Sequence, residues 1–257
     1  MGTELAAIVL AGGRSTRLRE SAPGDEIAKT LLRDGTGTRL VDAAIAAAAG
    51  TGARRIAVVG PRPDEAFAAA LDGADAEVDI LYAREDPPFA GPAAAIAAGL
   101  EALWPGAGRN DDQNVAPVGG ASTSPSDEAL VLVVGGDMPA AGPGLAALVE
   151  AFSDAPGPAG AETRADSPGP DGSAGVAATA HICLGDGAIA IADGRRQPLL
   201  SALRASSALR AFSGECSGAS VHRLLTALDL VEVDVPAGAA ADVDTWSDAR
   251  ALGFDTP

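Results

Sequence analysis

Apolar runs of strand length alternate with longer, helix-like stretches over the first 150 residues of the chain. The apolar runs lie at 5–10, 55–59, 78–82 and 130–134, and the helix-like stretches lie at 40–49, 63–71, 92–104 and 142–152. Pro92 suits a first helical turn, and Gly50 or Gly52 suits the end of a helix. Strands joined through helices form right-handed crossovers, so the pattern predicts a mostly parallel sheet with helices on both faces.

The C-terminal part of the chain has a more mixed pattern. Residues 176–184 and 188–192 flank Gly185-Asp186-Gly187, which predicts a β-hairpin. Helical patterns are found at 198–212 and 219–228, and 230–235 is typical of a final strand. A last helix is predicted to begin at Thr245, whose side chain can cap it, with Asp248 in the first turn.

Two stretches, 105–128 and 153–175, are rich in Gly, Pro, Ser and Asp. Neither contains enough apolar surface to order itself, and the alternation of strands and helices resumes after each. We therefore expect mobile surface insertions within one domain that spans 1–257.

The acidic composition narrows the classes of partner. A formal net charge of -17 argues against nucleic acid, because phosphate backbones are bound by clustered Lys and Arg. No apolar run reaches about 18 residues, so no membrane span is expected, and the run at 5–10 is predicted to be a strand and not a signal peptide. Cys183 and Cys216 are predicted to be free thiols in the reducing cytoplasm. His181 and His222 do not form a zinc-ligand pattern, and we interpret both as structural or surface residues.

The sharpest chemical feature is the segment that follows the first strand, Leu10-Ala11-Gly12-Gly13-Arg14. Glycines after a buried strand let backbone N–H groups approach an anion, and ligands of parallel sheets bind at the carboxyl ends of strands. Residues 14–39 hold six basic and four acidic side chains in an otherwise acidic chain. A polyphosphate site is the favoured interpretation, and a glycine turn beside a solvated basic face is the alternative.

Lys29 is the single lysine in a chain with seventeen arginines. A compact ammonium on a flexible stem suits a phosphate contact, although chance explains its presence equally well. The segment 24–30 is similar to a Walker P-loop, but it is one residue short, lacks the second glycine and places two carboxylates where phosphate would lie. The G-x-G-x-x-G fingerprint is also missing after the first strand.

A second candidate is Asp137, which follows Gly135-Gly136 at the end of the strand at 130–134. A carboxylate in such a position needs a partner, and Mg²⁺ that bridges to a nucleotide phosphate is a suitable one. An aspartate that caps the next helix is the alternative.

Together these segments resemble the molybdenum cofactor guanylyltransferase family. The matching positions are 10–13 with Arg17, 29–32, 86–92, 136–139, 194–200 and 242–245. The resemblance implies a three-layer, Rossmann-like sheet of the nucleotidyltransferase and glycosyltransferase-A type. It also implies transfer of GMP from GTP to molybdopterin with Mg²⁺ as cofactor, release of pyrophosphate, and transient contact with partners in molybdoenzyme maturation.

The resemblance also assigns roles to individual residues. Leu10, Ala11, Gly12, Gly13 and Arg14 would hold the nucleotide, Lys29 and Arg17 its triphosphate, Gly60 and Asp86 would lie near the guanosine, and Asp137 would bind Mg²⁺. Arg196, Gln197, Pro198, Asp242 and Asp244 would lie on the acceptor side, although a turn before a capped helix explains the last two equally well. Lys29, Arg17 and Asp137 are the implied catalytic residues.

Two other functions remain open. A related enzyme would use CTP or another phosphorylated acceptor, such as a phospholactate or a sugar phosphate. A nucleotide-binding homologue without turnover is the second alternative, because eleven residues separate Arg17 from Lys29 where the family has a short spacing.

Overall fold

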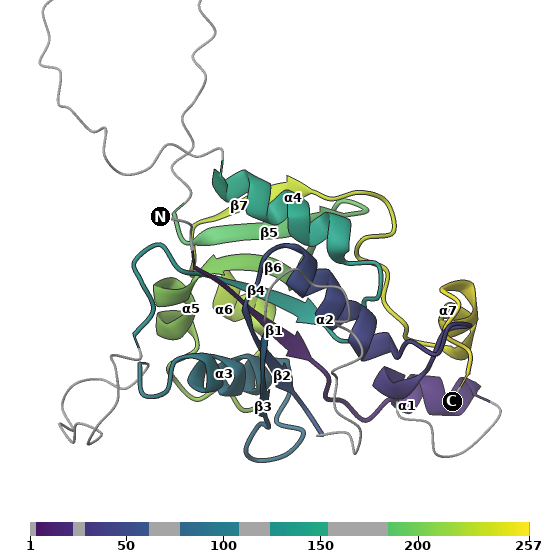
Figure 1. The fold of residues 1–257 in the computed structure, drawn as a ribbon. Coiled ribbons are helices and arrows are strands. Elements are labelled where there is room, and N and C mark those ends of the chain that lie inside the picture. The colour runs from purple at the N-terminus through teal and green to yellow at the C-terminus, as the bar shows by residue number, and fades with distance from the viewer. Residues whose placement is uncertain (1–3, 23–28, 62–77, 108–123, 154–184, 257) are drawn as a thin grey trace, which may run out of the picture.

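The computed structural model describes residues 4–22, 29–61, 78–107, 124–153 and 185–256. Within them, strands form one sheet with the order β3-β2-β1-β4-β6-β5-β7 (Figure 1). The strands are β1 (Leu5–Leu10), β2 (Arg55–Val59), β3 (Asp79–Ala83), β4 (Leu130–Gly135), β5 (Gly187–Ala192), β6 (Arg195–Arg204) and β7 (Leu230–Asp234).

The sheet is mostly parallel, as predicted. Among the described strands, β6 alone runs antiparallel to its neighbours, β4 and β5. Leu10 at the end of β1 is aligned with Val59 of β2 and Gly135 of β4. The carboxyl ends of these three strands therefore meet at one edge of the sheet, which we call the ligand edge.

Helices cover both faces of the sheet (Figure 1), which confirms the predicted three-layer architecture. Helices α2 (Leu40–Gly50) and α4 (Gly142–Ser153) lie on one face. Helices α3 (Pro92–Leu103), α5 (Ala205–Ala211) and α6 (Val221–Leu225) lie on the other. The alternation of apolar residues along β1 and β4 supplies both faces, because successive strand residues point to opposite sides.

A third, smaller apolar cluster lies beside the ligand edge. It is formed by Leu18 of α1 (Thr16–Ser21), Leu32 after the short 3₁₀ helix η1 (Lys29–Leu31), Leu40, Val243, and Ala249 of α7 (Trp246–Ala251), together with Phe254. As predicted, Thr245 caps α7, and it exchanges hydrogen bonds with Asp248 in a capping box. The cluster holds the C-terminal segment against residues that lie more than 200 positions earlier.

One predicted element is wrong. Residues 198–212 were expected to form a helix, but Pro198 to Arg204 belong to β6, and only Ala205–Ala211 are helical. The segment lies between β4 and β5, and Leu200 and Leu203 point to opposite faces of the sheet. Pairing on both sides therefore outweighs a local pattern that suits a helix.

The strand predicted at 188–192 also forms its hairpin with a different strand, β6, and not with residues 176–184. The hairpin joins β5 to β6 through Asp193-Gly194, and both residues have positive φ, as a two-residue type I′ turn requires. The predicted strand at 176–184 and the predicted helix at 63–71 lie outside the described residues, as do Cys183, His181 and most of the two expected insertions. The predicted helix at 219–228 is shorter and spans Val221–Leu225.

The structure also places three other single residues. Trp104 is buried at the end of α3, and Cys216 is a buried free thiol. His222 is exposed on α6. In the part of the chain that the structure describes, no helix has the length and apolar character needed to cross a membrane.

Candidate functional site

The loop after β1 forms the base of the candidate site. Ala11 N donates to the carbonyl of Val59 (2.8 Å), and Gly136 N donates to the carbonyl of Leu10 (2.9 Å). A Cβ atom on Gly60 would lie 2.7 Å from the carbonyl carbon of Ala11, and one on Gly136 would lie 2.9 Å from the Leu10 oxygen. Glycine at both positions thus allows the backbone of β2 and β4 to approach the loop closely and fix it in place.

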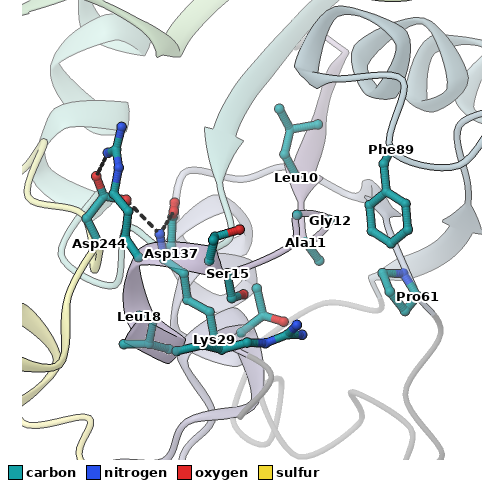
Figure 2. Close-up of a pocket in the computed structure, with 15 residues that line it drawn as sticks. Leu10, Ala11, Gly12, Ser15, Leu18, Lys29, Pro61, Phe89, Asp137 and Asp244 are labelled. Atoms are coloured by element: carbon teal, nitrogen blue, oxygen red, sulfur yellow. Dashed lines mark hydrogen bonds and ion pairs between the residues drawn. The ribbon is translucent and has the colours of Figure 1, made fainter. Parts of the chain in front are cut away.

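Lys29 is brought to this loop by η1. Its Nζ atom lies 2.6 Å from Asp137 Oδ2 and 3.1 Å from Asp244 Oδ1 (Figure 2). Burial opposes the charge on Lys29, but the carboxylate of Asp137 and then that of Asp244 outweigh this effect, so the pKa of Lys29 is raised. The ammonium therefore stays charged throughout the neutral range.

Three carboxylates meet at the end of β4. Asp137, Asp242 and Asp244 each offer one oxygen, and these oxygens lie within 4.8 Å of one another. Val243 N donates to the carbonyl of Asp137 (3.0 Å), which attaches the C-terminal segment to the β4 loop. Loss of hydration, together with the neighbouring carboxylates of Asp244 and Asp137, raises the pKa of Asp242. Mutual repulsion of this kind favours a bound cation.

Arg17 extends the charged network toward solvent. Its Nη1 atom lies 2.5 Å from Asp244 Oδ2, and its side chain is largely exposed. Desolvation tends to raise the pKa of Asp244, but Lys29 and Arg17 outweigh it, so the pKa is lowered. Two cations and a group of carboxylates thus share one side of the ligand edge.

These groups open onto a cavity of about 480 Å³ (Figure 2). It is lined by the loop after β1, by α1 and by single residues of other loops: Leu10, Ala11, Gly12, Gly13, Ser15, Thr16, Arg17, Leu18, Arg19, Lys29, Thr30, Pro61, Phe89, Asp137 and Asp244. Basic side chains and a glycine loop on one wall suit a polyphosphate, and the carboxylates beside them suit a divalent cation.

The structure brings most of the candidate residues together but leaves some apart. The first loop, Arg17, Lys29, Asp137 and Asp244 share the cavity, and Asp242 lies in the same acidic cluster. Gly60 supports the loop from behind, and Arg14 lines two adjoining cavities.

The remaining candidates lie outside these cavities. Asp86 is exposed in the loop between β3 and α3 and lines none of them. Arg196 is on β6, where its Nε atom pairs with Glu232 of β7 at 2.7 Å. Gln197 and Pro198 lie beside it on the same strand, and the next residue, Leu199, reaches a cavity wall.

Sequence reasoning missed Glu85 and Phe89. Both belong to the β3–α3 loop and line a smaller cavity beside Gly12 and Gly13. Their position in the chain could have indicated a site, because Glu85 lies two residues after β3, a strand that ends at the ligand edge.

Known proteins provide an independent comparison. A family model described as the MobA-like NTP transferase domain matches residues 7–233. A search of curated proteins found no match.

Solved structures share the fold at low sequence identity. A nucleotidyl transferase from Methanothermobacter thermautotrophicus has a TM-score of 0.60 and 17% identity, covering 98% of this chain and 97% of that chain. Molybdopterin-guanine dinucleotide biosynthesis protein A from Archaeoglobus fulgidus has a TM-score of 0.52 and 15% identity, covering 96% of each chain. The inositol-1-phosphate CTP transferase from T. maritima has a TM-score of 0.53 and 14% identity, covering 96% and 92%. These likenesses support the fold, and the family model spans most of the sequence. The chain therefore belongs to the family of MobA-like NTP transferase domains.

Proposed function

We propose that this NTP transferase domain transfers GMP from GTP to molybdopterin and releases pyrophosphate. The observation that carries the proposal is the position of Lys29 Nζ, 2.6 Å from Asp137 at the open side of the Gly12-Gly13 loop. Support for this acceptor comes from the motifs Gly91-Pro92 and 194–200, and from the structural likeness to the A. fulgidus protein named for molybdopterin-guanine dinucleotide biosynthesis.

The chemistry needs positioning and charge more than proton transfer. The attacking oxygen belongs to a phosphate that is already an anion, so no side chain has to remove a proton. The oxygen forms a bond to the α-phosphorus of GTP while the bond to the pyrophosphate oxygen breaks. In this proposal the Gly12-Gly13 loop orients the triphosphate, and Lys29 with Arg17 stabilises the negative charge that develops on pyrophosphate.

The acidic cluster fits a magnesium ion. Asp137, Asp242 and Asp244 present hard oxygen donors close together, which is the donor type that Mg²⁺ prefers. When bound, the ion would neutralise phosphate charge and act as a Lewis acid at the phosphoryl group. The acceptor is proposed to lie near the start of β6, at Arg196, Gln197 and Pro198. This end of β6 lies at the ligand edge, and the next residue, Leu199, lines a cavity.

Pyrophosphate release tests the proposal directly. The protein is incubated with GTP, Mg²⁺ and molybdopterin, and we expect release that Lys29→Ala lowers by about 10²–10³-fold. Arg223→Ala serves as the control, because it removes one positive charge at an exposed position on α6. Equal rates in wild type and Lys29→Ala, or no release with any nucleotide and acceptor, would contradict the proposal.

CTP transfer to another phosphorylated acceptor is the second candidate. The structural likeness to the inositol-1-phosphate CTP transferase of T. maritima favours it. The same assay with CTP and a panel of sugar and polyol phosphates separates the two functions, because only one nucleotide and acceptor pair will support full release.

A further inference from the structure

Asp244 contacts both cations of the site from a segment that is neither helix nor strand. The segment lies between β7 and α7. Asp244 Oδ1 pairs with Lys29 Nζ (3.1 Å), and Asp244 Oδ2 pairs with Arg17 Nη1 (2.5 Å). The same carboxylate belongs to the acidic cluster with Asp137 and Asp242. A side chain that serves several groups at once needs a fixed backbone, because a small displacement separates it from all of them.

The backbone of Asp244 is held by the side chain of Asp248, in the first turn of α7. Asp248 Oδ2 accepts hydrogen bonds from Asp244 N (3.2 Å), Thr245 N (2.7 Å) and the Thr245 hydroxyl (2.8 Å). A capping box accounts for the bond from Thr245 N, because Thr245 is the N-cap residue. The bond from Asp244 N is additional, and it connects the cap of α7 directly to a residue of the candidate site.

Two other contacts attach the same segment to its surroundings. Val243 N donates to the carbonyl of Asp137 (3.0 Å), and Trp246 N donates to Ser21 Oγ (3.0 Å) at the end of α1. Neither contact involves Asp248, so both remain when that residue is changed. Loss of the Asp248 side chain should therefore shift the carboxylate that lies between these two attachments without releasing the whole segment.

We propose that Asp248 is a positioning residue, which holds the Asp244 carboxylate toward Lys29 and the magnesium site. The inference rests on the proposed function, because it takes a nucleotide and its magnesium ion as the ligands of the cavity. Asp248 lines none of the three cavities at the ligand edge, so it acts through Asp244 and not by contact with substrate. Removal of a side chain that orients a metal ligand typically lowers metal affinity by about 10–100-fold.

Replacement of Asp248 by Ala and by Asn separates its hydrogen bonds from its charge. Both variants remove one negative charge, but the three bonds go to a single oxygen, which the carbonyl of Asn can replace. With Mg²⁺ present, calorimetry should show that Asp248→Ala binds GTP about tenfold more weakly than wild type, or worse. Asp248→Asn should stay within about threefold of wild type, because its carbonyl oxygen is still an acceptor.

The same titration with EDTA in place of Mg²⁺ distinguishes positioning from damage to the fold. Without the ion, Asp248→Ala and wild type should bind GTP within about threefold of each other, because Asp244 then has no ion to hold. Ser220→Ala is the matched control, because it removes the side-chain cap of α6, and it should bind like wild type in both conditions. A loss in Asp248→Ala that is equal with and without Mg²⁺ contradicts the inference.

A double-mutant cycle determines whether Asp248 acts through Asp244. Asp244→Ala alone should weaken GTP binding in the presence of Mg²⁺, and the addition of Asp248→Ala should cause no further loss. Additive losses overturn the inference, as does wild-type affinity in Asp248→Ala. Equal losses in Asp248→Ala and Asp248→Asn also overturn it, because the charge alone then explains the effect.

Failure of this inference can be told apart from failure of the proposed function. If wild type binds CTP and not GTP, the titrations use CTP, and only the proposed nucleotide is wrong. Affinities that follow the expected pattern, without pyrophosphate release to any acceptor, overturn the proposed function and support the role of Asp248. Wild type that binds neither nucleotide overturns both. If Asp248→Ala does not unfold cooperatively, Asp248→Asn decides, and a loss of about tenfold or more in that variant contradicts the inference.

Discussion

At the scale of single residues, the sequence singled out Lys29 and Asp137, which the structure brings together, but it did not indicate their other contacts. Lys29 is predicted to be a phosphate ligand partly because it is the single lysine of the chain. Its contact with Asp244, 215 positions away, depends on the C-terminal segment that packs beside α1. Glu85 was missed because the order of residues does not encode its burial, or that one of its two carboxylate oxygens has no hydrogen-bond partner among the described residues.

Gly60 provides a test at this scale. A Cβ atom there would lie 2.7 Å from the backbone of Ala11 and of Gly12, and the residue has a φ of 153°. We expect Gly60→Ala to lower the free energy of unfolding by about 1–3 kcal/mol and to weaken nucleotide binding. Thermal unfolding and calorimetry measure both effects. Gly35→Ala is the matched control, because its Cβ atom would meet open space, and an equal loss in the control would refute the explanation.

At the scale of elements, the apolar pattern predicted the ends of β1, β2, β3 and β4 to within one residue. The same pattern gave the wrong prediction for β6. The first four strands are short apolar runs with clear ends, so local pattern and tertiary position agree. Residues 195–204 are mostly Leu, Ala, Arg and Ser, which suit a helix locally, yet they pair with strands on both sides. The Asp193-Gly194 turn was a usable hairpin signal that was overlooked.

Asp186 joins three elements at the edge of the sheet opposite the ligand edge. It accepts hydrogen bonds from Ser207 Oγ (2.5 Å), Arg210 Nη2 (2.9 Å) and Asp229 N (2.9 Å). The Ser207 hydroxyl, then Asp229 N–H and Arg210, lower the pKa of Asp186. Because the folded protein holds this proton less tightly than the unfolded chain, the carboxylate stabilises the fold above the usual aspartate pKa. That contribution is lost as the pH falls through the lowered folded value.

We therefore expect Asp186→Asn to lower the free energy of unfolding by about 1–3 kcal/mol at pH 7 and by much less near pH 2–3. Urea unfolding over this pH range measures the difference. Asp193→Asn is the control, because this exposed turn residue has a left-handed conformation that Asn also adopts. A loss in Asp186→Asn that is the same at every pH would contradict the assignment.

At the scale of the whole molecule, the ligand edge brings cations and carboxylates together in a chain with a net charge of -17. The cations of the larger cavity come from α1 and from η1, whereas the cluster of carboxylates comes from the β4 loop and the C-terminal segment. Binding of a magnesium nucleotide should therefore stabilise the whole fold, because the ligand joins parts of the chain that are distant in sequence.

Thermal unfolding tests this coupling. At a GTP concentration of about 100 times the Kd with Mg²⁺, the expected stabilisation is about 2.7 kcal/mol. For a domain of this size it corresponds to a rise in Tm of roughly 5–10 °C. Addition of EDTA should remove most of the rise, and Asp137→Asn should show little dependence on Mg²⁺. A rise that EDTA leaves unchanged would show that the acidic cluster does not hold the ion.

The single reversed strand of the described sheet has a consequence for how such a protein can change. Strand β6 begins five residues before Leu200, which is the residue where its pairing with β4 ends. In this first part of β6, Arg195, Arg196 and Gln197 pair with β5 and not with β4. A longer or shorter turn at Asp193-Gly194 would therefore alter this overhanging tip without shifting the register between β4 and β6. The loop that carries Gly12 and Gly13 comes from another strand. The two segments can thus diverge separately, so the length of the turn can change while the loop that carries Gly12 and Gly13 stays intact.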